Sequence, residues 1–511
     1  MATITCFDGV GCIGGNKIFL KDKNTGLWFD FGLNVSHMGK FYEEYLQPKT
    51  CLGLYEPIQM GLIPPISNLY REDLESSIAN PWEGVEIHDI GETHGILISH
   101  GHLDHLGSIH YVKGNIPIYC SAMTLALAKA CQDIGMGNEC SYISERREKP
   151  TGELEVARDQ PTVSRPYCLT DEEPNENLIE FWNSTPSSRK AHKPKPIIKS
   201  SKCGDLNIYR FSVDHSIYGA SAWAVETSEG WLVYTGDLRC HGTACHCTWD
   251  FADKVKKLKP RALIIEGTRI NSNTKRTEED VYNNALQEVK KAEGLVVADF
   301  NSRNVERLNA FLKIAKETDR KLAILTKDAY LIRAMRLVDS NIPSLDDDNI
   351  VIYSEFEATT TNWKKSIKDE YKHKLIEPKD VRKNQDKFIC CFRFFDVNEL
   401  ALIKPIAGSI WIYSSCEAFN EEMKIDQERL KAWLEKYDMV FLGGTDDDQG
   451  NPFHVSGHAN GADILKLIEE IQPEIVIPIH TEEKNLSIFN DSLKGKCQVK
   501  VPEVGVPINL Y

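Results

Sequence analysis

Four residues of metal-ligand type, His100, His102, Asp104 and His105, follow the apolar run 96–98 in the order H-x-H-x-D-H. Neutral imidazoles and carboxylates suit zinc and similar divalent ions, and a sharp loop after a strand can aim alternate side chains at one point. Two such ions can share one water, lower its pKa and clamp both oxygens of an in-line phosphoryl displacement. The segment therefore predicts a dinuclear metal site and a metallohydrolase.

Histidines near a loop can also simply hydrogen-bond to one another, and this is the alternative for the first cluster. Further ligand-type residues, each at the end of a β-like run, weigh against it. They are His215 after 206–211, Asp237 after 231–234 and His480 after 475–479. Each segment is weak by itself, and together they predict one site assembled from strand ends.

The order of these segments resembles the motifs of the metallo-β-lactamase superfamily. Glu266-Gly267-Thr268 ends the run 262–265, and the stretch His454 to Ala459 (HVSGHA) precedes a helix-like segment. Both are similar to motifs of the β-CASP nucleases in that superfamily, and the second is most similar to the RNase J group. The resemblance covers nearly the whole chain. It implies an α/β protein, a metallo-β-lactamase αββα sandwich with an inserted β-CASP α/β domain.

By position, the resemblance also implies roles for the metal ligands. Two divalent ions are expected, with Zn²⁺ as the leading choice and Mn²⁺ as the alternative. The first ion would be held by His100, His102 and His215, the second by Asp104, His105 and His480, and Asp237 would bridge them. A hydroxide between the ions would attack phosphorus, with Asp104 both ligating and orienting it. Asp30, at an early strand end, would orient the metal-binding loop.

Other motif residues are expected to serve the substrate. Glu266 would hydrogen-bond to a ligating or phosphate-facing imidazole and fix its tautomer. His454 would contact the scissile phosphate or assist the leaving oxygen, because a 3′-alkoxide departs with difficulty unless a proton or positive charge is near. The resemblance therefore makes Asp104, Glu266 and His454 the expected catalytic residues.

Phosphate binding is expected at two further places. Ser456, the backbone at Gly457, and His458 would hold a phosphate next to the cleaved bond, because small residues allow N–H groups to approach closely. Ser302 and Arg303, at the start of a helix-like stretch, resemble another phosphate-binding position of the family. For Ser302 the alternative is an ordinary helix-start residue.

Length and composition set the broad class. A chain of 511 residues predicts two or three compact units. The net charge of −15 argues against a generally basic nucleic-acid coat, although a local positive groove and two metals can still hold phosphates. No apolar run is long enough for a bilayer, the first residues lack a signal-peptide profile, and the 15 cysteines lack framework spacing. These features predict a cytoplasmic protein without a membrane partner.

The N-terminus contains a G-x-G-x-x-G pattern at 9–14, with Asp30 at about the offset of a ribose-binding acid. The pattern is followed by strand-like 16–21, a turn at 24–26 and strand-like 27–32, which predict a hairpin. Since a hairpin offers no helix N-terminus for a pyrophosphate, a dinucleotide site is not expected here.

The middle of the chain divides into two differently patterned parts. Residues 132–202 are polar and are expected to form an elaboration whose basic run, 189–195, either guides RNA or is a solvated loop. From 281 to about 338, helix-like and strand-like stretches alternate, which predicts parallel βαβ units. We expect the metallo-β-lactamase domain at 1–270 and 453–511, and the β-CASP domain at 271–452.

Three features leave questions open. The stretch Cys240 to Cys247 contains three Cys and two His, but adjacent residues seldom converge on one tetrahedral ion, so a loop is favoured over a structural zinc site. His480 is followed by Thr481, where the RNase J group usually has glycine. Because the chain ends soon after the catalytic motifs, we do not expect the C-terminal domain common in that group, and homo-oligomerisation is left open.

The leading hypothesis is a metal-dependent ribonuclease that acts on single-stranded RNA, endonucleolytically, exonucleolytically from the 5′ end, or both. A DNA-processing β-CASP nuclease is the second hypothesis, because the sequence does not locate a reader of the 2′-hydroxyl. A small-molecule esterase or lactonase would explain the metal motif but not the inserted domain. A silent RNA-binding subunit would have no physical need for the full ligand set.

Overall fold

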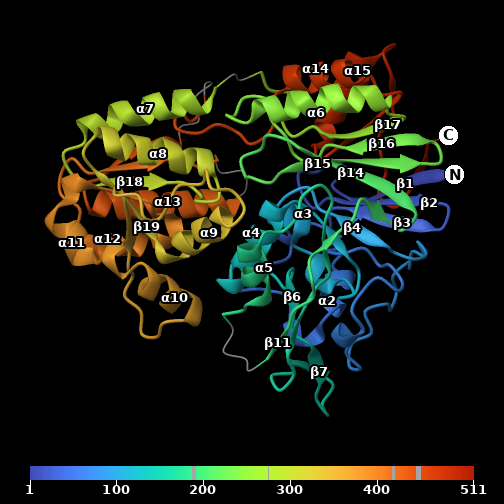
Figure 1. Ribbon diagram of the computed structural model, residues 1–511, viewed down its shortest axis with the longest axis horizontal. Coiled ribbons are helices and arrows are strands. Elements are labelled where there is room, and N and C mark those ends of the chain that lie inside the picture. Colours follow the sequence, from blue (N-terminus) through green and yellow to red (C-terminus); the bar gives the residue numbers. More distant parts are fainter. Residues whose placement is uncertain (187–190, 274–275, 417–420, 445–449, 511) are drawn as a thin grey trace.

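The computed structural model describes residues 1–186, 191–273, 276–416, 421–444 and 450–510. Within these ranges the strands form three large sheets and two small ones. Two large sheets lie together on the right of Figure 1, and the third lies on the left with helices around it. The N- and C-terminal ends lie close together because the last strand pairs with the first.

The first large sheet is mixed. Its N-terminal strands are antiparallel, and its remaining strands, from β3 onward, are parallel. In spatial order, the described strands of this sheet are β12 (Ile198–Lys199), β10 (Tyr167–Leu169), β5 (Ile118–Tyr119), β4 (Gly95–Leu97), β3 (Thr25–Phe29), β2 (Lys17–Asp22), β1 (Ala2–Asp8) and β27 (Pro507–Asn509).

The second large sheet is also mixed, with antiparallel strands up to β16 and parallel strands after it. In spatial order, its described strands are β13 (Lys202–Cys203), β14 (Leu206–Ser212), β15 (Ser221–Thr227), β16 (Gly230–Tyr234), β17 (Ala262–Glu266), β25 (Ile475–Ile479) and β26 (Gln498–Val499). Strand β25 therefore joins this sheet from a position more than 200 residues along the chain from β17.

These two sheets pack face to face around one apolar core. Leu20 and Phe29 of the first sheet pack in this core with Trp223, Ile264 and Ile477 of the second. All five side chains are fully or almost fully buried, so the burial of both inner faces holds the sandwich together.

Helices cover both outer faces of the sandwich. Against the first sheet lie α2 (Tyr55–Gln59), α4 (Ala122–Asp133) and α5 (Glu176–Asn183). Against the second lie α6 (Cys245–Leu258), α14 (Gly461–Ile471) and α15 (Leu486–Leu493), which Figure 1 shows above the sheet. Two short helices, α1 (Val35–Met38) and α3 (Leu103–Leu106), follow strands of the first sheet. The layers are those of the expected αββα sandwich.

The third large sheet is parallel throughout. Its described strands, in spatial order, are β21 (Leu375–Ile376), β20 (Ile350–Tyr353), β19 (Lys321–Leu325), β22 (Phe388–Cys390), β18 (Val296–Asp299), β23 (Ile410–Tyr413) and β24 (Val440–Leu442). One face packs against α7 (Glu278–Lys291), α8 (Val305–Glu317), α9 (Thr326–Arg336) and α10 (Asn362–Glu370). The other packs against α11 (Pro378–Lys383), α12 (Leu400–Ile403) and α13 (Glu421–Lys436).

The alternating pattern of the sequence predicts this inserted domain correctly, with small shifts at the element ends. The helix predicted from Val281 begins one turn earlier because Thr277 and Asp280 form a capping box. The composition of the three sheets supports the boundaries near residues 270 and 452, which we propose as the domain limits.

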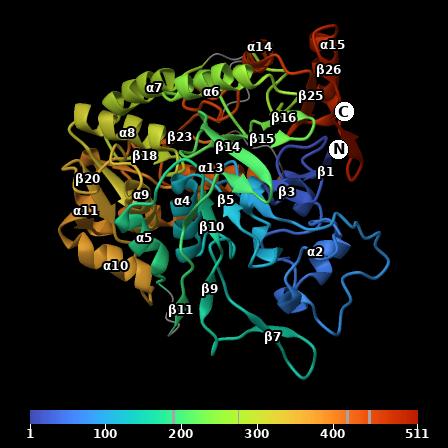
Figure 2. The same ribbon diagram turned by 45° about the vertical axis from the view of Figure 1, so that its right-hand side comes forward.

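The segment 132–202 forms an elaboration that belongs partly to the first sheet, because it supplies β10 and β12. The rest forms a small sheet of β6 (Tyr142–Ile143), β9 (Thr162–Ser164) and β11 (His192–Lys193), and a hairpin of β7 (Arg146–Glu148) and β8 (Leu154–Val156). Figures 1 and 2 both show this hairpin projecting from the molecule.

The predicted basic run has a structural role where it is described. His192 bonds to Thr162 and Ser164 across the small sheet, and Lys195 Nζ donates to the Gly114 carbonyl. Arg189 and Lys190 of the run lie outside the described residues. Within the described ranges, no helix combines the length and the apolarity that crossing a bilayer requires.

The inter-sheet core predicts the effect of truncating Trp223. This side chain is fully buried, and its Nε1 donates to the Ile98 carbonyl of the opposing sheet at 3.1 Å. Trp223→Ala should lower the free energy of unfolding by about 3–5 kcal/mol, because it opens a cavity and leaves a carbonyl unpaired. Glu226→Ala, at an exposed position of the same strand, should change it by less than about 0.5 kcal/mol. Urea unfolding followed by circular dichroism measures both; equal effects would contradict a packed core at Trp223.

Candidate metal centre

The seven predicted metal ligands come together at one end of the sandwich. His100 follows β4, His102 precedes α3, and Asp104 and His105 lie within α3. The remaining ligands follow strands of the second sheet: His215 after β14, Asp237 after β16 and His480 after β25. Strand ends from both sheets therefore meet here, as the sequence predicts.

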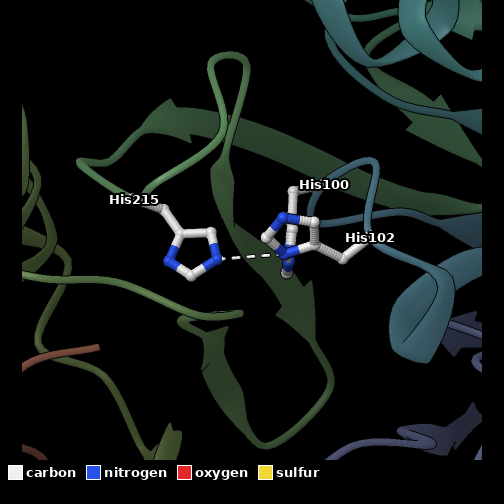
Figure 3. A group of neighbouring side chains, drawn as sticks. All are labelled: His100, His102 and His215. Atoms are coloured by element: carbon white, nitrogen blue, oxygen red, sulfur yellow. Dashed lines mark hydrogen bonds between the residues drawn. The ribbon is translucent and has the colours of Figure 1, made fainter. Parts of the chain in front are cut away.

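The first donor group consists of His100, His102 and His215, whose rings point toward one another (Figure 3). His102 Nδ1 lies 2.9 Å from His100 Nε2 and 3.2 Å from His215 Nε2. Burial and neighbouring imidazoles hold the pKa of His100 and of His215 well below the usual value. Burial and the nearby Arg303 lower the pKa of His102 to about 3. All three rings are thus neutral, which is the form that binds a metal.

The second donor group consists of Asp104, His105, Asp237 and His480. His480 Nε2 lies 3.4 Å from Asp104 Oδ2, and His105 Nε2 lies 3.0 Å from Asp237 Oδ2. Although burial acts to raise the pKa of Asp237, His105, His480 and His458 hold it well below the usual value. The carboxylate is therefore ionised.

Asp237 belongs to the second donor group and also lies near the first. Its Oδ2 is 3.7 Å from His100 Nε2 and 4.0 Å from His215 Nε2, and its Oδ1 is 3.8 Å from His480 Nε2. A carboxylate in this position can offer one oxygen to each of two ions. The geometry therefore supports the bridging role that the family resemblance implies.

Two unpartnered atoms show that this set of residues fits metal ions. His105 Nε2 and Asp237 Oδ1 are buried, and neither atom makes a hydrogen bond of acceptable geometry among the described residues, although His105 Nε2 lies 3.0 Å from Asp237 Oδ2. A buried polar atom without a partner costs about 1–3 kcal/mol, and more when it is charged. Divalent ions would satisfy both atoms, so the residues fit the metal site that the sequence predicts.

Asp30 orients this centre, as expected. Its Oδ2 accepts hydrogen bonds from His105 Nδ1 at 2.7 Å and Tyr234 Oη at 2.6 Å, and both its oxygens accept from Ser99. With Nδ1 held by Asp30, the Nε2 of His105 faces Asp237. Thr268 acts similarly, since its Oγ1 lies 2.9 Å from His480 Nδ1. Thr268 is part of the Glu266-Gly267-Thr268 motif, but sequence reasoning assigned it no role in orienting a ligand.

The glycine-rich loop after β1 packs against the metal loop instead of binding a dinucleotide. Gly15 N donates to the Asp104 carbonyl, and β2 begins at Lys17 without an intervening helix. A β-carbon on Gly14, whose φ is +82°, would lie 2.9 Å from Asp104 Cβ. One on Gly32 would lie 1.7 Å from the Asp104 carbonyl oxygen. These glycines are required for close approach to Asp104.

Glu266 bonds to an imidazole, as predicted, and the structure shows that it belongs to His458. The Glu266 carboxylate oxygens lie 2.9 and 3.1 Å from His458 Nδ1. His458 Nδ1 is also 3.9 Å from Asp237 Oδ2, so His458 adjoins the metal ligands. Despite burial, Glu266 and Asp237 raise the pKa of His458 to about 9. Its ring is therefore protonated at neutral pH.

His454 has different surroundings. Burial and the nearby Arg307 lower its pKa to about 3, with Glu278 acting in the opposite direction. Among the described residues, His454 is in none of the three donor groups that could hold an ion, whereas His458 and Glu266 form the third group with Asp237 and His480. His454 is therefore a neutral ring on the side of the inserted domain.

The backbone between these two histidines contacts a metal ligand. The Gly457 carbonyl accepts from His215 Nδ1 at 2.5 Å, which aims His215 Nε2 at the first donor group. A β-carbon on Gly457 would lie 2.8 Å from His215 Cε1, so glycine is needed for this approach. Ser456 Oγ accepts from the His458 N–H, and its carbonyl accepts from His241 Nε2 at 2.9 Å.

The side chains of Ser302 and Arg303 have different surroundings in the structure. Ser302 is buried and its hydroxyl donates to Asp328 Oδ1 at 2.8 Å. Arg303 is partly exposed and close enough to His102 to lower the pKa of that group. Phosphate binding by either residue stays a prediction.

The Cys240 to Cys247 stretch does not converge on an ion. Cys245, His246 and Cys247 begin α6, and this stretch contributes to none of the donor groups found in the described ranges. His241 instead bonds to the Ser456 carbonyl. The loop interpretation is supported over a structural zinc site.

Comparisons with known proteins agree with this geometry. Residues 451–502 match the family described as the Zn-dependent metallo-hydrolase RNA specificity domain. The chain is 20% identical over 509 residues to Ribonuclease J of Helicobacter pylori strain J99, with 95% of this chain and 56% of that protein covered. It is 21% identical over 438 residues to Ribonuclease J 2 of Streptococcus pyogenes serotype M3, with 82% of this chain and 64% of the relative covered.

A solved structure shares the whole architecture. A protein of unknown function from Enterococcus faecalis V583 is 21% identical, has a TM-score of 0.66, and is matched over 99% of both chains. The fold and site thus define a metallo-β-lactamase fold with a β-CASP insertion. Within that class, the relatives support the RNase J-like family that the motifs indicate. The chain spans about half the length of the first curated relatives it matches.

The orienting role of Asp30 gives a direct test of the metal centre. Asp30→Asn should weaken binding of divalent ions by roughly 10- to 100-fold, because the amide no longer holds His105 in its ligating orientation. Asp22→Asn is the matched control, since Asp22 is an equally buried acid of the same sheet that bonds to Ser228. Titration of metal-free protein with Zn²⁺ measures both affinities. Unchanged affinity in Asp30→Asn would refute the orienting role.

Proposed function

We propose that the chain is a metal-dependent ribonuclease that hydrolyses phosphodiester bonds of single-stranded RNA. The observation that carries this proposal is the adjoining pair of donor groups: Asp237 of the second group lies 3.7 Å from His100 of the first, and the second group contains two unpartnered buried ligand atoms. RNA as the substrate is supported by the matched RNA specificity domain and by relatives named Ribonuclease J.

We propose two ions in this centre, one for each donor group. Imidazole-rich sites with carboxylates suit Zn²⁺, and the matched family is described as Zn-dependent; Mn²⁺ is the alternative. When bound, such ions supply Lewis-acid activation of water and neutralise charge on a phosphodiester.

The protein groups around the ions would divide the remaining work. Asp104 has the more exposed ligand carboxylate, at 27% against 2% for Asp237, so it faces the substrate side and can accept a proton from the attacking water. Arg303 would balance the phosphate charge beside His102. Ser456 and the Gly457 backbone would adjoin the neighbouring phosphate.

We assign proton donation to the leaving 3′-oxygen to His458 and not to His454. A proton donor must lie close to the reacting groups, and His458 adjoins the metal ligands, with its Nδ1 2.9 Å from Glu266 Oε2 and 3.9 Å from Asp237 Oδ2. Burial and the nearby Arg307 keep the His454 ring neutral, and among the described residues it belongs to none of the donor groups. This assignment changes the role that the sequence motif implies for His454.

We also propose a reducing compartment, the cytoplasm, as the place of action. Within the described ranges no disulfide joins two cysteines, and eight cysteines are buried. Free thiols in this number persist where glutathione and thioredoxin keep them reduced.

The metal requirement and the substrate preference can be tested together. Protein stripped by a chelator should be inactive on RNA, and about two equivalents of Zn²⁺ or Mn²⁺ per chain should restore cleavage. Matched single-stranded RNA carrying a 5′-monophosphate or a 5′-triphosphate, and single-stranded DNA of the same sequence, should be compared with product lengths resolved. RNA should be cleaved faster than DNA.

Each outcome of that comparison is informative. Activity that is indifferent to the chelator would refute the metal centre as the catalytic site. Equal rates on RNA and DNA would move the assignment to a DNA-processing nuclease. Preference for the monophosphate with stepwise products would indicate exonucleolytic action from the 5′ end.

Alanine variants of the two histidines of the HVSGHA segment distinguish the roles proposed for them. His458→Ala should lower kcat by about 10²- to 10⁴-fold, the usual scale for a lost proton donor. His454→Ala should lower kcat much less, because its ring is neutral and belongs to none of the donor groups of the described residues. Metal content of both variants, measured by elemental analysis, serves as the control. A larger loss of kcat in His454→Ala, with metal retained, would return the donor role to His454.

A further inference from the structure

A buried network of charges joins the metal-binding loops to the inserted domain. Its members are two arginines and three carboxylates, all at most 6% exposed: Arg239, Arg307, Asp214, Glu278 and Glu306. Asp214 precedes the ligand His215, and Arg239 lies two residues after the ligand Asp237. The glutamates lie on α7 and α8 of the inserted domain.

Arg239 is the centre of this network. Its Nε donates to Asp214 Oδ1 at 3.1 Å, while its Nη2 donates to Glu306 Oε2 at 2.6 Å and its Nη1 to Glu278 Oε1 at 3.4 Å. The planar guanidinium thus contacts three carboxylates in separate directions, which the point charge of a lysine cannot reproduce. One contact is to its own domain and two are to the inserted domain.

Backbone contacts make the two ligand loops one unit. Arg239 N donates to the Asp214 carbonyl at 2.8 Å, and Gly242 N donates to Asp214 Oδ2 at 2.9 Å. Thr243 N donates to Glu306 Oε1 at 2.9 Å, so the loop after Asp237 is attached directly to α8. Any displacement of Glu306 would be transmitted to both loops.

The network also reaches the HVSGHA segment. Arg307 binds Glu278 through Nε at 3.0 Å, and its Nη1 donates to the carbonyl of Phe453, the residue before His454, at 3.0 Å. The inserted domain therefore contacts the catalytic end of the sandwich through residues adjacent to three motif positions.

We propose that Arg239 is a positioning residue through which Glu306 and Glu278 of the inserted domain set the placement of the metal ligands His215 and Asp237. This inference rests on the proposed metal centre. Its physical consequence is that metal affinity depends on a residue of the inserted domain, Glu306, that is not itself a ligand.

A second interdomain contact provides the matched control. Asp133 of α4 bonds to Lys129 and accepts from Tyr330 Oη of α9 at 2.8 Å. This contact is also buried and also joins the two domains, but none of its residues adjoins a metal ligand in sequence. Tyr330→Phe removes one interdomain hydrogen bond without touching the Arg239 network.

The test compares Glu306→Gln, Arg239→Lys and Tyr330→Phe with the unaltered full-length chain. Metal-free proteins are titrated with Zn²⁺ by calorimetry, and circular dichroism verifies the fold. Glu306→Gln and Arg239→Lys should bind Zn²⁺ roughly 10- to 100-fold more weakly, the scale seen when groups that orient ligands are lost. Tyr330→Phe should keep the affinity of the unaltered chain. Excess Zn²⁺ should partly restore RNA cleavage by Glu306→Gln.

The outcomes distinguish this inference from the proposed function. If the unaltered chain binds no divalent ion, the proposed function fails. If it binds ions and Glu306→Gln binds them equally well, only the positioning role of Arg239 is overturned. Equal weakening in Tyr330→Phe would also overturn it, because domain contact in general would then control affinity. If Glu306→Gln does not fold, Arg239→Lys, which keeps the net charge, decides.

Discussion

The crowding of five imidazoles and two carboxylates into one buried region is the constraint on which the rest of the structure depends. Burial alone favours neutral groups, so His100 and His215 lose their protons while Asp237 stays ionised among its neighbours. Atoms such as His105 Nε2 then remain without a hydrogen-bond partner in the described part of the chain. Divalent ions would bind to these atoms. Their positive charge would also attract RNA phosphates to this place, although the net charge of the protein is −15.

Orientation of the ligands is distributed over distant parts of the chain. Asp30 holds His105, Thr268 holds His480 and the Gly457 carbonyl holds His215. The Nδ1 atom of each of these three rings is therefore bonded to a different segment of the chain. Such contacts determine which ring nitrogen faces the ion, and their loss commonly weakens metal binding. The centre is consequently a property of the assembled sandwich and not of the H-x-H-x-D-H loop alone.

The inserted domain contributes to this assembly through charge as well as apolar packing. A buried ion pair adds little net stability, because desolvation of the charges opposes their attraction, but breaking one is costly. A network of this kind therefore suits the task of fixing one relative position of two domains. In this protein, Arg239 connects that position to the loops of His215 and Asp237.

The sequence by itself determined which ligand-type residues come together and the order of the elements. Ligand-type residues after apolar runs, such as Asp237 and His480, identify strand ends locally, and the alternation from 281 to 338 identifies a parallel sheet. Tertiary structure alone decided which groups pair: Glu266 with His458 across 192 positions, Ser302 with Asp328, and Arg239 with Glu306. Periodicity reports only which face of an element is buried, whereas the partner of a polar side chain depends on how separate elements pack. For that reason our proposal of His458 as the proton donor, in place of His454, depends on the fold and not on the motif alone.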